Sequence, residues 1–236
     1  MIGIIGAMDE EVLALQKRMD GIRERKIANT VFYEGVLHNK PIVLLRSGIG
    51  KVNAAISTTL LCEHYPIQAI INMGTAGGLS QRAHVLDLVI ATEVVYFDVD
   101  VTGFGYSYGQ VPQMPSAYTS NEVLVEKFKS VIDFFDVPYH EGLVVSGDSF
   151  IARADQREMI LSRFPEAIAV EMEGAAIAQV AYIYRKPFII IRALSDIAGK
   201  KSSLSFSEFL DSASKRSADL VSEFIGTLDW DCINHE

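Results

Sequence analysis

The first stretch of the sequence that could carry chemistry is GAMDEEV, residues 6–12, which directly follows the apolar run MIGII. A helix start there would present free backbone N–H groups, which usually attract anions such as phosphate, yet Asp9, Glu10 and Glu11 occupy it. Helical spacing turns Glu10 to solvent and places Glu11 beside the apolar stripe, so Glu11 is the acid able to enter a crevice. A structural explanation fits as well, because Asp9 is a good N-cap and acids in a first turn favour the helix dipole.

A second acidic pair lies in AVEMEGAAIA, residues 169–178, where Glu171 and Glu173 interrupt an apolar run. Strand alternation predicts that both carboxylates share one side and that Met172 faces the other. A buried carboxylate needs hydrogen bonds, which vicinal sugar hydroxyls could donate. Pairing with an arginine or capping of a helix would satisfy it equally well, and the spacing does not decide between these explanations.

The stretch RALSD, residues 192–196, places Asp196 at the exit of a predicted strand. Desolvation there would raise the pKa of Asp196, which a general acid working near neutral pH requires. The alternative is that Asp196 only caps the following turn.

Two glycine-rich stretches, SGIGK (residues 47–51) and GTAGG (residues 74–78), resemble nucleotide cradles. Neither completes a P-loop or a dinucleotide-binding fingerprint, so tight turns between strand and helix are an equally good interpretation.

The elements that must position these residues alternate between apolar, β-branched runs and segments of helical period, which predicts an α/β domain. Residues 29–46 hold two strand-like runs on either side of LHNK, which predicts an antiparallel hairpin within the sheet. The predicted strands cover residues 1–8, 41–48, 68–75, 87–97, 141–148, 167–173 and 187–194. The predicted helices cover residues 9–19, 52–64, 121–135, 155–163, 174–184 and 207–228.

Ligands of open α/β sheets bind beyond the carboxyl ends of the strands. The exits expected to line a site are therefore GAMDEE, SGIGK, MGTAGG, SGDSF, VEMEG and RALSD. The segment 98–117 is long and rich in glycine, proline and aromatic residues, which favours a binding lip or a subunit contact over a plain surface loop.

The overall composition narrows the function classes. A formal charge of −9 over 236 residues disfavours nucleic acid as a partner, because phosphate-backbone binding needs a basic surface. No apolar run is long enough for a membrane span, and the acids at 9–11 interrupt a signal peptide, so we expect a cytoplasmic protein with no membrane partner. Cys62 and Cys232 are expected to be free thiols, and no histidine pair has metal-ligand spacing.

Seven stretches, taken in order, resemble the 5′-methylthioadenosine/S-adenosylhomocysteine nucleosidases over nearly the whole chain: IGIIGAMDEEV, SGIGKVNAA, NMGTAGGL, DVDVTGFGYSYGQVP, VSGDSFI, AVEMEGAAIA and RALSD. The resemblance implies a single domain over residues 1–236, with a three-layer α/β/α nucleoside phosphorylase-like fold around a mixed sheet. It also implies a homodimer, no cofactor and no metal. The implied reaction is hydrolysis of the bond between adenine and a 5′-thio-substituted ribose, a step of methionine salvage and quorum-sensing metabolism.

The resemblance also implies roles for individual residues. Asp196 matches the general acid that shares a proton with N7 of adenine, and Glu11 matches the general base that activates water, with Arg192 and Thr75 near that water. Such a division fits an oxocarbenium-like transition state, which needs a leaving-group acid on one side and activated water on the other. The two carboxyl groups must then have different environments.

The remaining implied contacts belong to the sugar, the base and the alkylthio group. Glu173 matches the carboxylate that holds the ribose hydroxyls, and Met172 packs beneath the sugar. Phe150 matches the ring stacked on adenine, and Ile151 gives backbone contacts to the base. Further substrate contacts are assigned to Ala7, Met8, Ile49 and Gly77, and the neighbouring subunit is expected to contribute Phe104, Tyr106 and Pro112.

Three alternatives stay open on sequence alone. A purine nucleoside phosphorylase would share the fold, but phosphate beside Glu11 would meet like-charge repulsion, and the first loop has no arginine to offset it. An aminodeoxyfutalosine nucleosidase would use the same chemistry on another 5′ group. A non-catalytic nucleoside-binding module would not need both Glu11 and Asp196. Asp9 and Thr75 stand where glutamate and serine are frequent in the family, and both keep the chemical group.

Overall fold

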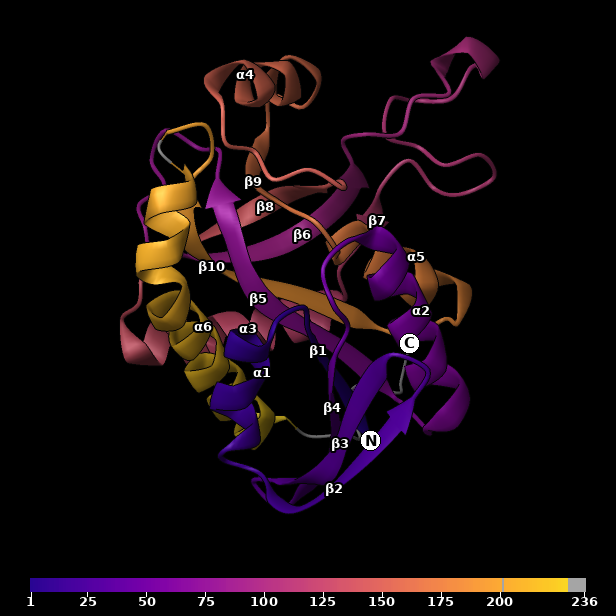
Figure 1. Ribbon diagram of the computed structural model, residues 1–236, viewed down its shortest axis with the longest axis vertical. Helices are drawn as coiled ribbons and strands as arrows, with labels where there is room; N and C mark the ends of the chain where they lie inside the picture. The colour runs from indigo at the N-terminus through magenta and orange to yellow at the C-terminus, as the bar shows by residue number, and fades with distance from the viewer. Residues whose placement is uncertain (201, 229–236) are drawn as a thin grey trace.

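The computed structural model describes residues 1–200 and 202–228 of the chain. They form one mixed sheet covered by helices (Figure 1), which confirms the predicted α/β fold class. The last eight residues of the domain predicted over 1–236, which include Cys232, lie outside the described residues. Within that described part, no helix is both long and apolar enough to cross a membrane.

The helices are α1 (Asp9–Gln16), α2 (Lys51–His64), α3 (Glu122–Phe135), α4 (Ala154–Arg163), α5 (Gly174–Ile183) and α6 (Ser202–Thr227), with a 3-10 turn η1 (Thr102–Phe104). The strands are β1 (Ile2–Gly6), β2 (Asp20–Ile27), β3 (Thr30–Leu37), β4 (Lys40–Arg46), β5 (Ala69–Gly78), β6 (Leu88–Tyr96), β7 (Tyr118–Thr119), β8 (Tyr139–Ser146), β9 (Ala167–Glu171) and β10 (Phe188–Ile197).

The sheet has the order β10-β6-β8-β9-β5-β1-β4-β3-β2, and β5 pairs with β10 as well as with β1 and β9. Because β10 also pairs with β6, the strands β5, β10, β6, β8 and β9 close into a ring. The order places the long strand β5 at the junction between this ring and the open part of the sheet. The last residues of β5, Gly77 and Gly78, pair with β9 and so lie where the ring closes.

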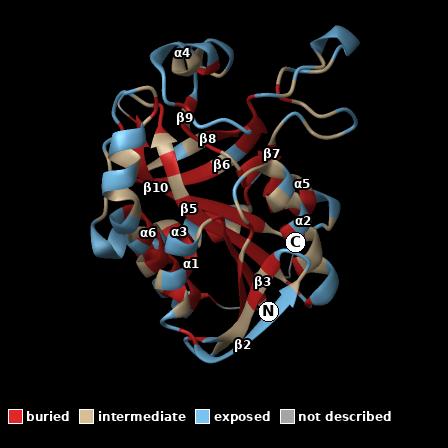
Figure 2. Cartoon of the chain, in the orientation of Figure 1, coloured by how far each residue is buried: buried red, intermediate tan, exposed pale blue. Residues whose placement is uncertain are grey.

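Two apolar layers hold the helices against the sheet. On one face α1, α3 and α6 pack on a cluster that includes Leu15, Phe128 and Phe224, all fully buried. On the other face α2 and α5 pack through small and branched side chains such as Ala54 and Ile177. Figure 2 shows the central strands buried and the outer faces of the helices exposed, while the edge strand β2 is exposed.

The predicted hairpin is confirmed, because β3 and β4 pair antiparallel around His38 and Asn39, which both have positive φ angles (49° and 61°). Two residues with positive φ are typical of a tight type I′ hairpin turn. Strand β2 was not predicted. Its sequence DGIRERKI is almost wholly exposed at the sheet edge, so it has no apolar alternation for a pattern to detect.

Several predicted boundaries were wrong. Helix α1 ends at Gln16 rather than at residue 19, and α6 begins at Ser202 rather than at residue 207. Strand β9 ends at Glu171, so strand alternation does not extend to Glu173, which caps α5 instead. Strand β10 continues to Ile197, with an irregular register against β5 between Leu194 and Asp196. Such irregularities re-aim side chains near functional sites.

Candidate active site

One pocket gathers residues from all six predicted strand exits, which confirms that these exits meet. It is lined by Ala7, Met8 and Glu11, by Ile49, by Thr75, Ala76 and Gly77, by Ser149, Phe150 and Ile151, by Val170, Glu171, Met172 and Glu173, by Ser195, Asp196 and Ala198, and by Phe206. Of the residues predicted to touch substrate within one chain, Arg192 is the one that does not line this pocket.

Glu11 lies in the first turn of α1 and is buried at the pocket wall, while Glu10 is exposed as predicted. One carboxylate oxygen, Oε2, accepts from the backbone N–H groups of Ala7 (2.7 Å) and Met8 (3.2 Å). The other, Oε1, accepts from Thr75 N (2.9 Å) and Thr75 Oγ1 (3.2 Å). Backbone N–H groups only donate, so this set of partners suits an ionised Glu11.

The residue that caps α1 is Met8, not Asp9 as predicted. Glu11, three residues into the helix, accepts the N–H of Met8, whereas Asp9 faces outward and accepts from Arg46 Nη1 at 2.7 Å. The side chain of Glu11 thus accepts a backbone N–H group at the start of its own helix and also lines the pocket. The capping function and the pocket-facing position belong to the same carboxylate.

Gly74 is required by the position of Glu11. A Cβ atom added at Gly74 would lie 2.7 Å from Glu11 Oε1, closer than non-bonded atoms approach. Burial raises the pKa of Glu11, and the nearby Arg192 guanidinium and the backbone donors oppose that rise. The hydrogen-bond donors and Arg192 favour the ionised form of Glu11, while burial keeps its pKa above that of an exposed glutamate.

Asp196 lies on β10 at the irregular register opposite Gly77, and its side chain is buried. Its Oδ1 accepts from Ser195 Oγ at 3.0 Å. Burial raises the pKa of Asp196, and the serine hydroxyls that contact it only partly oppose this. Fewer donors surround Asp196 than Glu11, so the two carboxyl groups have the unequal environments that separate an acid from a base.

Glu173 is the N-cap residue of α5 and is 8% exposed. Its Oε1 accepts from the backbone N–H of Gly50 at 2.8 Å, and Gly50 has a positive φ of 94° that favours glycine. Burial and the neighbouring Glu171 carboxylate raise the pKa of Glu173. This contact joins the loop after β4 to the start of α5 across the pocket.

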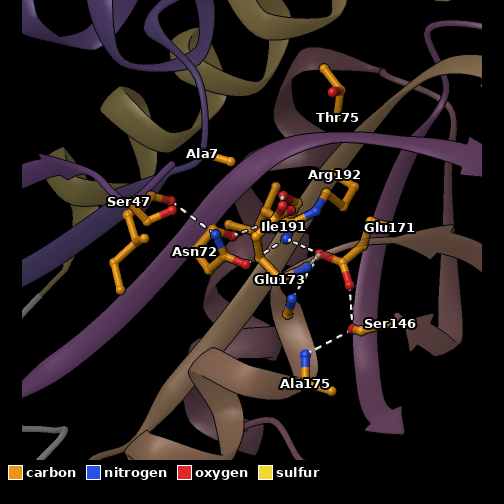
Figure 3. A network of polar contacts seen from close by, with 12 residues as sticks. Ala7, Ser47, Asn72, Thr75, Ser146, Glu171, Glu173, Ala175, Ile191 and Arg192 are labelled. Carbon is orange, nitrogen blue, oxygen red and sulfur yellow. Dashed lines mark hydrogen bonds and ion pairs between the residues drawn. The ribbon is translucent and has the colours of Figure 1, made fainter. Parts of the chain in front are cut away.

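Glu171 has a different role, because it is the centre of a buried polar network (Figure 3). Its Oε2 accepts from Arg192 Nη2 at 2.7 Å and from the backbone N–H groups of Glu173 (3.0 Å) and Gly174 (2.8 Å). Its Oε1 accepts from Ser146 Oγ, which in turn accepts from Ala175 N at 2.8 Å. The structural explanation left open by the sequence, an arginine partner and a helix cap, is therefore correct for Glu171.

Arg192 is held on its other side by Asn72, whose backbone oxygen accepts from Nη1 at 3.2 Å and whose side-chain oxygen accepts from Nη2. Figure 3 shows the guanidinium between Asn72 and Glu171. The sequence did not indicate this network, because its members are on four strands, β5, β8, β9 and β10, and at the start of α5. No short-range spacing relates them.

The aromatic and apolar lining of the pocket includes the predicted residues Phe150 and Ile151 and one residue that was not predicted, Phe206. Phe150 and Ile151 lie in the loop between β8 and α4, and Ile151 accepts from Gly199 N at 3.0 Å through its backbone oxygen. Phe150 makes an edge-to-face contact with Phe206, with ring centroids 5.6 Å apart. Phe206 was not predicted as a site residue, because the sequence pattern places the start of the last helix at residue 207, whereas α6 begins at Ser202.

The three residues expected from a neighbouring subunit lie elsewhere in the chain. Phe104 and Pro112 are exposed, Tyr106 is half-buried, and none of them lines the pocket of its own chain. They belong to the segment between β6 and β7, which projects from the body at the upper right of Figure 1.

Among the described residues, the charged side chains that line the pocket are all acidic, and neither lysine nor arginine is one of them. Among residues 1–200 and 202–228, no group of three or more His, Cys, Asp or Glu side chains is placed to hold a metal ion. The pocket therefore offers carboxyl groups and backbone N–H donors to a bound substrate.

Comparison with known proteins agrees with this geometry. Residues 1–226 match the Phosphorylase superfamily. The 5′-methylthioadenosine/S-adenosylhomocysteine nucleosidase of Halalkalibacterium halodurans is 51% identical, over 96% of this chain and 98% of that protein. The enzyme of the same name from Staphylococcus epidermidis is 48% identical, over 97% and 100%. The Neisseria meningitidis enzyme, solved in complex with methylthio-immucillin-A, superimposes with a TM-score of 0.95 at 43% identity, over 96% and 99%. The chain therefore belongs to the phosphorylase superfamily and, within it, to the family of 5′-methylthioadenosine/S-adenosylhomocysteine nucleosidases.

Proposed function

We propose that the chain hydrolyses the N-glycosidic bond of 5′-methylthioadenosine and S-adenosylhomocysteine, releasing adenine and the 5-thio-substituted ribose. Asp196 gives its proton to N7 of adenine, and the electrons of the breaking bond move to the base. Glu11 takes a proton from the water whose oxygen joins C1′ of the ribose. One observation carries the proposal, namely that these two buried carboxyl groups line one pocket in unequal environments.

The positions of the two carboxyl groups along β5 support this division of roles. Glu11 approaches β5 at Gly74, and Asp196 approaches it at Gly77, where an added Cβ would lie 3.2 Å from Asp196 Oδ2. These glycines are three residues apart, about 10 Å along an extended strand. A nucleoside can therefore lie between a group that protonates the base and a group that activates water.

Glu173 is assigned to the ribose hydroxyls. Positive charge that develops on the ribose favours the ionised form of Glu173, so its hydrogen bonds to the hydroxyls strengthen in the transition state. Thr75 donates to Glu11 and orients it. Arg192 acts on Glu11 through its charge and on Glu171 through their ion pair.

Water is favoured over phosphate as the nucleophile. A phosphate dianion would need a cation in the pocket, and the lining residues that the structure describes supply none, while Arg192 is already paired with Glu171. The membership of a phosphorylase superfamily makes the phosphate-dependent reaction the alternative to test.

We further propose a homodimer in which Phe104, Tyr106 and Pro112 of one subunit cover the alkylthio end of the neighbouring pocket. Phe104 is 86% exposed, which is unusual for a large apolar side chain unless another surface covers it. Sedimentation should show twice the chain mass. Phe104→Ala should raise KM for 5′-methylthioadenosine, and an unchanged KM would contradict the assignment.

The decisive assay measures adenine release from 5′-methylthioadenosine and from S-adenosylhomocysteine, with and without inorganic phosphate. We expect equal rates in both conditions and free thio-substituted ribose as the second product. Strict dependence on phosphate, with ribose 1-phosphate formed, would refute hydrolysis. A failure to release adenine in either condition would refute the substrate assignment.

A further inference from the structure

The active-site pocket continues into a second, polar hollow beyond the exits of β1 and β4. Both cavities share Ala7, Met8 and Ile49 as lining residues. Asp196 and Phe150 line the first cavity only, so the end assigned to adenine lies away from this opening. A substituent on the 5′ carbon that is longer than methylthio would therefore pass Met8 and Ile49 and enter the hollow.

The side chains of the hollow carry both signs of charge. Asp9, Glu10, Arg46 and Asn53 contribute to its walls. Arg46 Nη1 donates to Asp9 Oδ2 at 2.7 Å, with the two side chains 39% and 61% exposed. A guanidinium has five N–H donors in a planar fork, so Arg46 can hold Asp9 and a second carboxylate together.

The rim of the hollow is set by a local hydrogen bond. Asn53 Nδ2 donates to the backbone oxygen of Ile49 at 2.7 Å, which ties the loop after β4 to the first turn of α2. Ile49 is thereby held at the passage between the two cavities. The charged side chains of the hollow therefore lie next to the active-site pocket, and Ile49 marks the passage between the two cavities.

We propose that this hollow, the tail site (Asp9, Glu10, Arg46 and Asn53), binds the α-amino acid end of a long 5′-thio substituent. Arg46 pairs with the α-carboxylate, and the carboxylates of Asp9 and Glu10 face the α-ammonium group. A zwitterion needs one cation and at least one anion close together, as Arg46 and Asp9 are, and a methylthio group needs neither. The inference rests on the proposed function and makes Arg46 the residue that distinguishes S-adenosylhomocysteine from 5′-methylthioadenosine.

The test compares three substrates: S-adenosylhomocysteine, its analogue that lacks the α-carboxylate and ends in the amine, and 5′-methylthioadenosine. The wild-type enzyme should have a lower KM for S-adenosylhomocysteine than for the amine-ended analogue. Arg46→Gln should raise KM for S-adenosylhomocysteine about tenfold, as the loss of one charge-assisted hydrogen bond implies. Its kcat should stay unchanged, because the tail is remote from the reacting bond.

Arg46→Gln should leave both constants for 5′-methylthioadenosine and for the amine-ended analogue unchanged, which also shows that the variant is folded. Arg23→Gln is the matched control, since Arg23 is an exposed arginine on β2 that lines neither cavity. Equal KM values for the carboxylate and amine-ended substrates in the wild type would overturn the tail site, as would an equal loss for all three substrates in Arg46→Gln. Failure of the proposed function gives a different result, in which the wild type does not hydrolyse 5′-methylthioadenosine at all.

Discussion

Glu171 Oε2 lies 2.7 Å from Arg192 Nη2, and both side chains are only 2% exposed. The same carboxylate accepts the backbone N–H groups that begin α5, so the ion pair and the helix start are one unit. Glu173 directly precedes that helix and lines the pocket. The ion pair between Glu171 and Arg192 thus helps to fix the position of Glu173, the residue assigned to the ribose.

Removing one member of this pair should destabilise the protein. Glu171→Gln leaves the Arg192 charge buried without its carboxylate, which costs about 3 kcal/mol or more. Denaturant unfolding followed by circular dichroism measures the loss. Asp155→Asn is the control, because it breaks the exposed Arg153–Asp155 pair, with side chains 66% and 70% exposed. An exposed pair of this kind contributes little to stability, because water screens the two charges. Equal losses in the two variants would contradict the structural role of Glu171.

Asp196→Asn should retain nucleoside binding and lose activity by a factor of about 10² to 10⁴, the usual size of a general acid's contribution. Amide and carboxyl groups have nearly the same size, so the pocket keeps its shape while N7 of adenine receives no proton. Single-turnover kinetics should show a slow chemical step, and calorimetry should give an affinity for 5′-methylthioadenosine close to the KM of the wild type. A variant with near-normal kcat would remove Asp196 from this role.

The stability of the same variant has a defined sign. Burial raises the pKa of Asp196 in the folded state, so the folded protein binds its proton more tightly than the unfolded chain does. The free energy of unfolding therefore falls as pH rises from the pKa of Asp196 in the unfolded chain through its higher pKa in the folded protein. Asp196→Asn should be at least as stable as the wild type at pH 8. Lower stability at that pH would indicate a structural role.

The pH dependence of kcat/KM should be bell-shaped. Activity rises with pH as Glu11 loses its proton, and burial moves that limb above the ordinary glutamate pKa of 4.5. Activity falls at higher pH as Asp196 loses its proton, and burial likewise moves this limb above 3.8. Glu11→Gln should remove most activity, and whatever remains should lack the acidic limb. An acidic limb of normal shape in Glu11→Gln would assign it to another group.

How much of this site the sequence could predict depends on the range of the interaction. Glu11 and Asp196 were found because carboxyl ends of strands meet at one edge of a sheet, a rule that needs only the order of strands and helices. The pairing of Glu171 with Arg192 could not be predicted, because it joins β9 to β10 across a ring of strands that no local pattern reveals. Phe206 was missed because an exposed first turn has weak helical periodicity.

Gly74 provides the most direct test of the geometry around Glu11. In Gly74→Ala the new Cβ would lie 2.7 Å from Glu11 Oε1, so the carboxylate must move from its Thr75 donors. A shift of this size at a catalytic group should lower kcat about a hundredfold. Gly226→Ala is the control, since an added Cβ there makes only ordinary contacts, the nearest 3.4 Å from His38 Cγ. The crystal structure of Gly74→Ala should show Glu11 displaced and its bond to Thr75 N lost. Normal kcat with Glu11 displaced would show that this carboxylate does not activate the water.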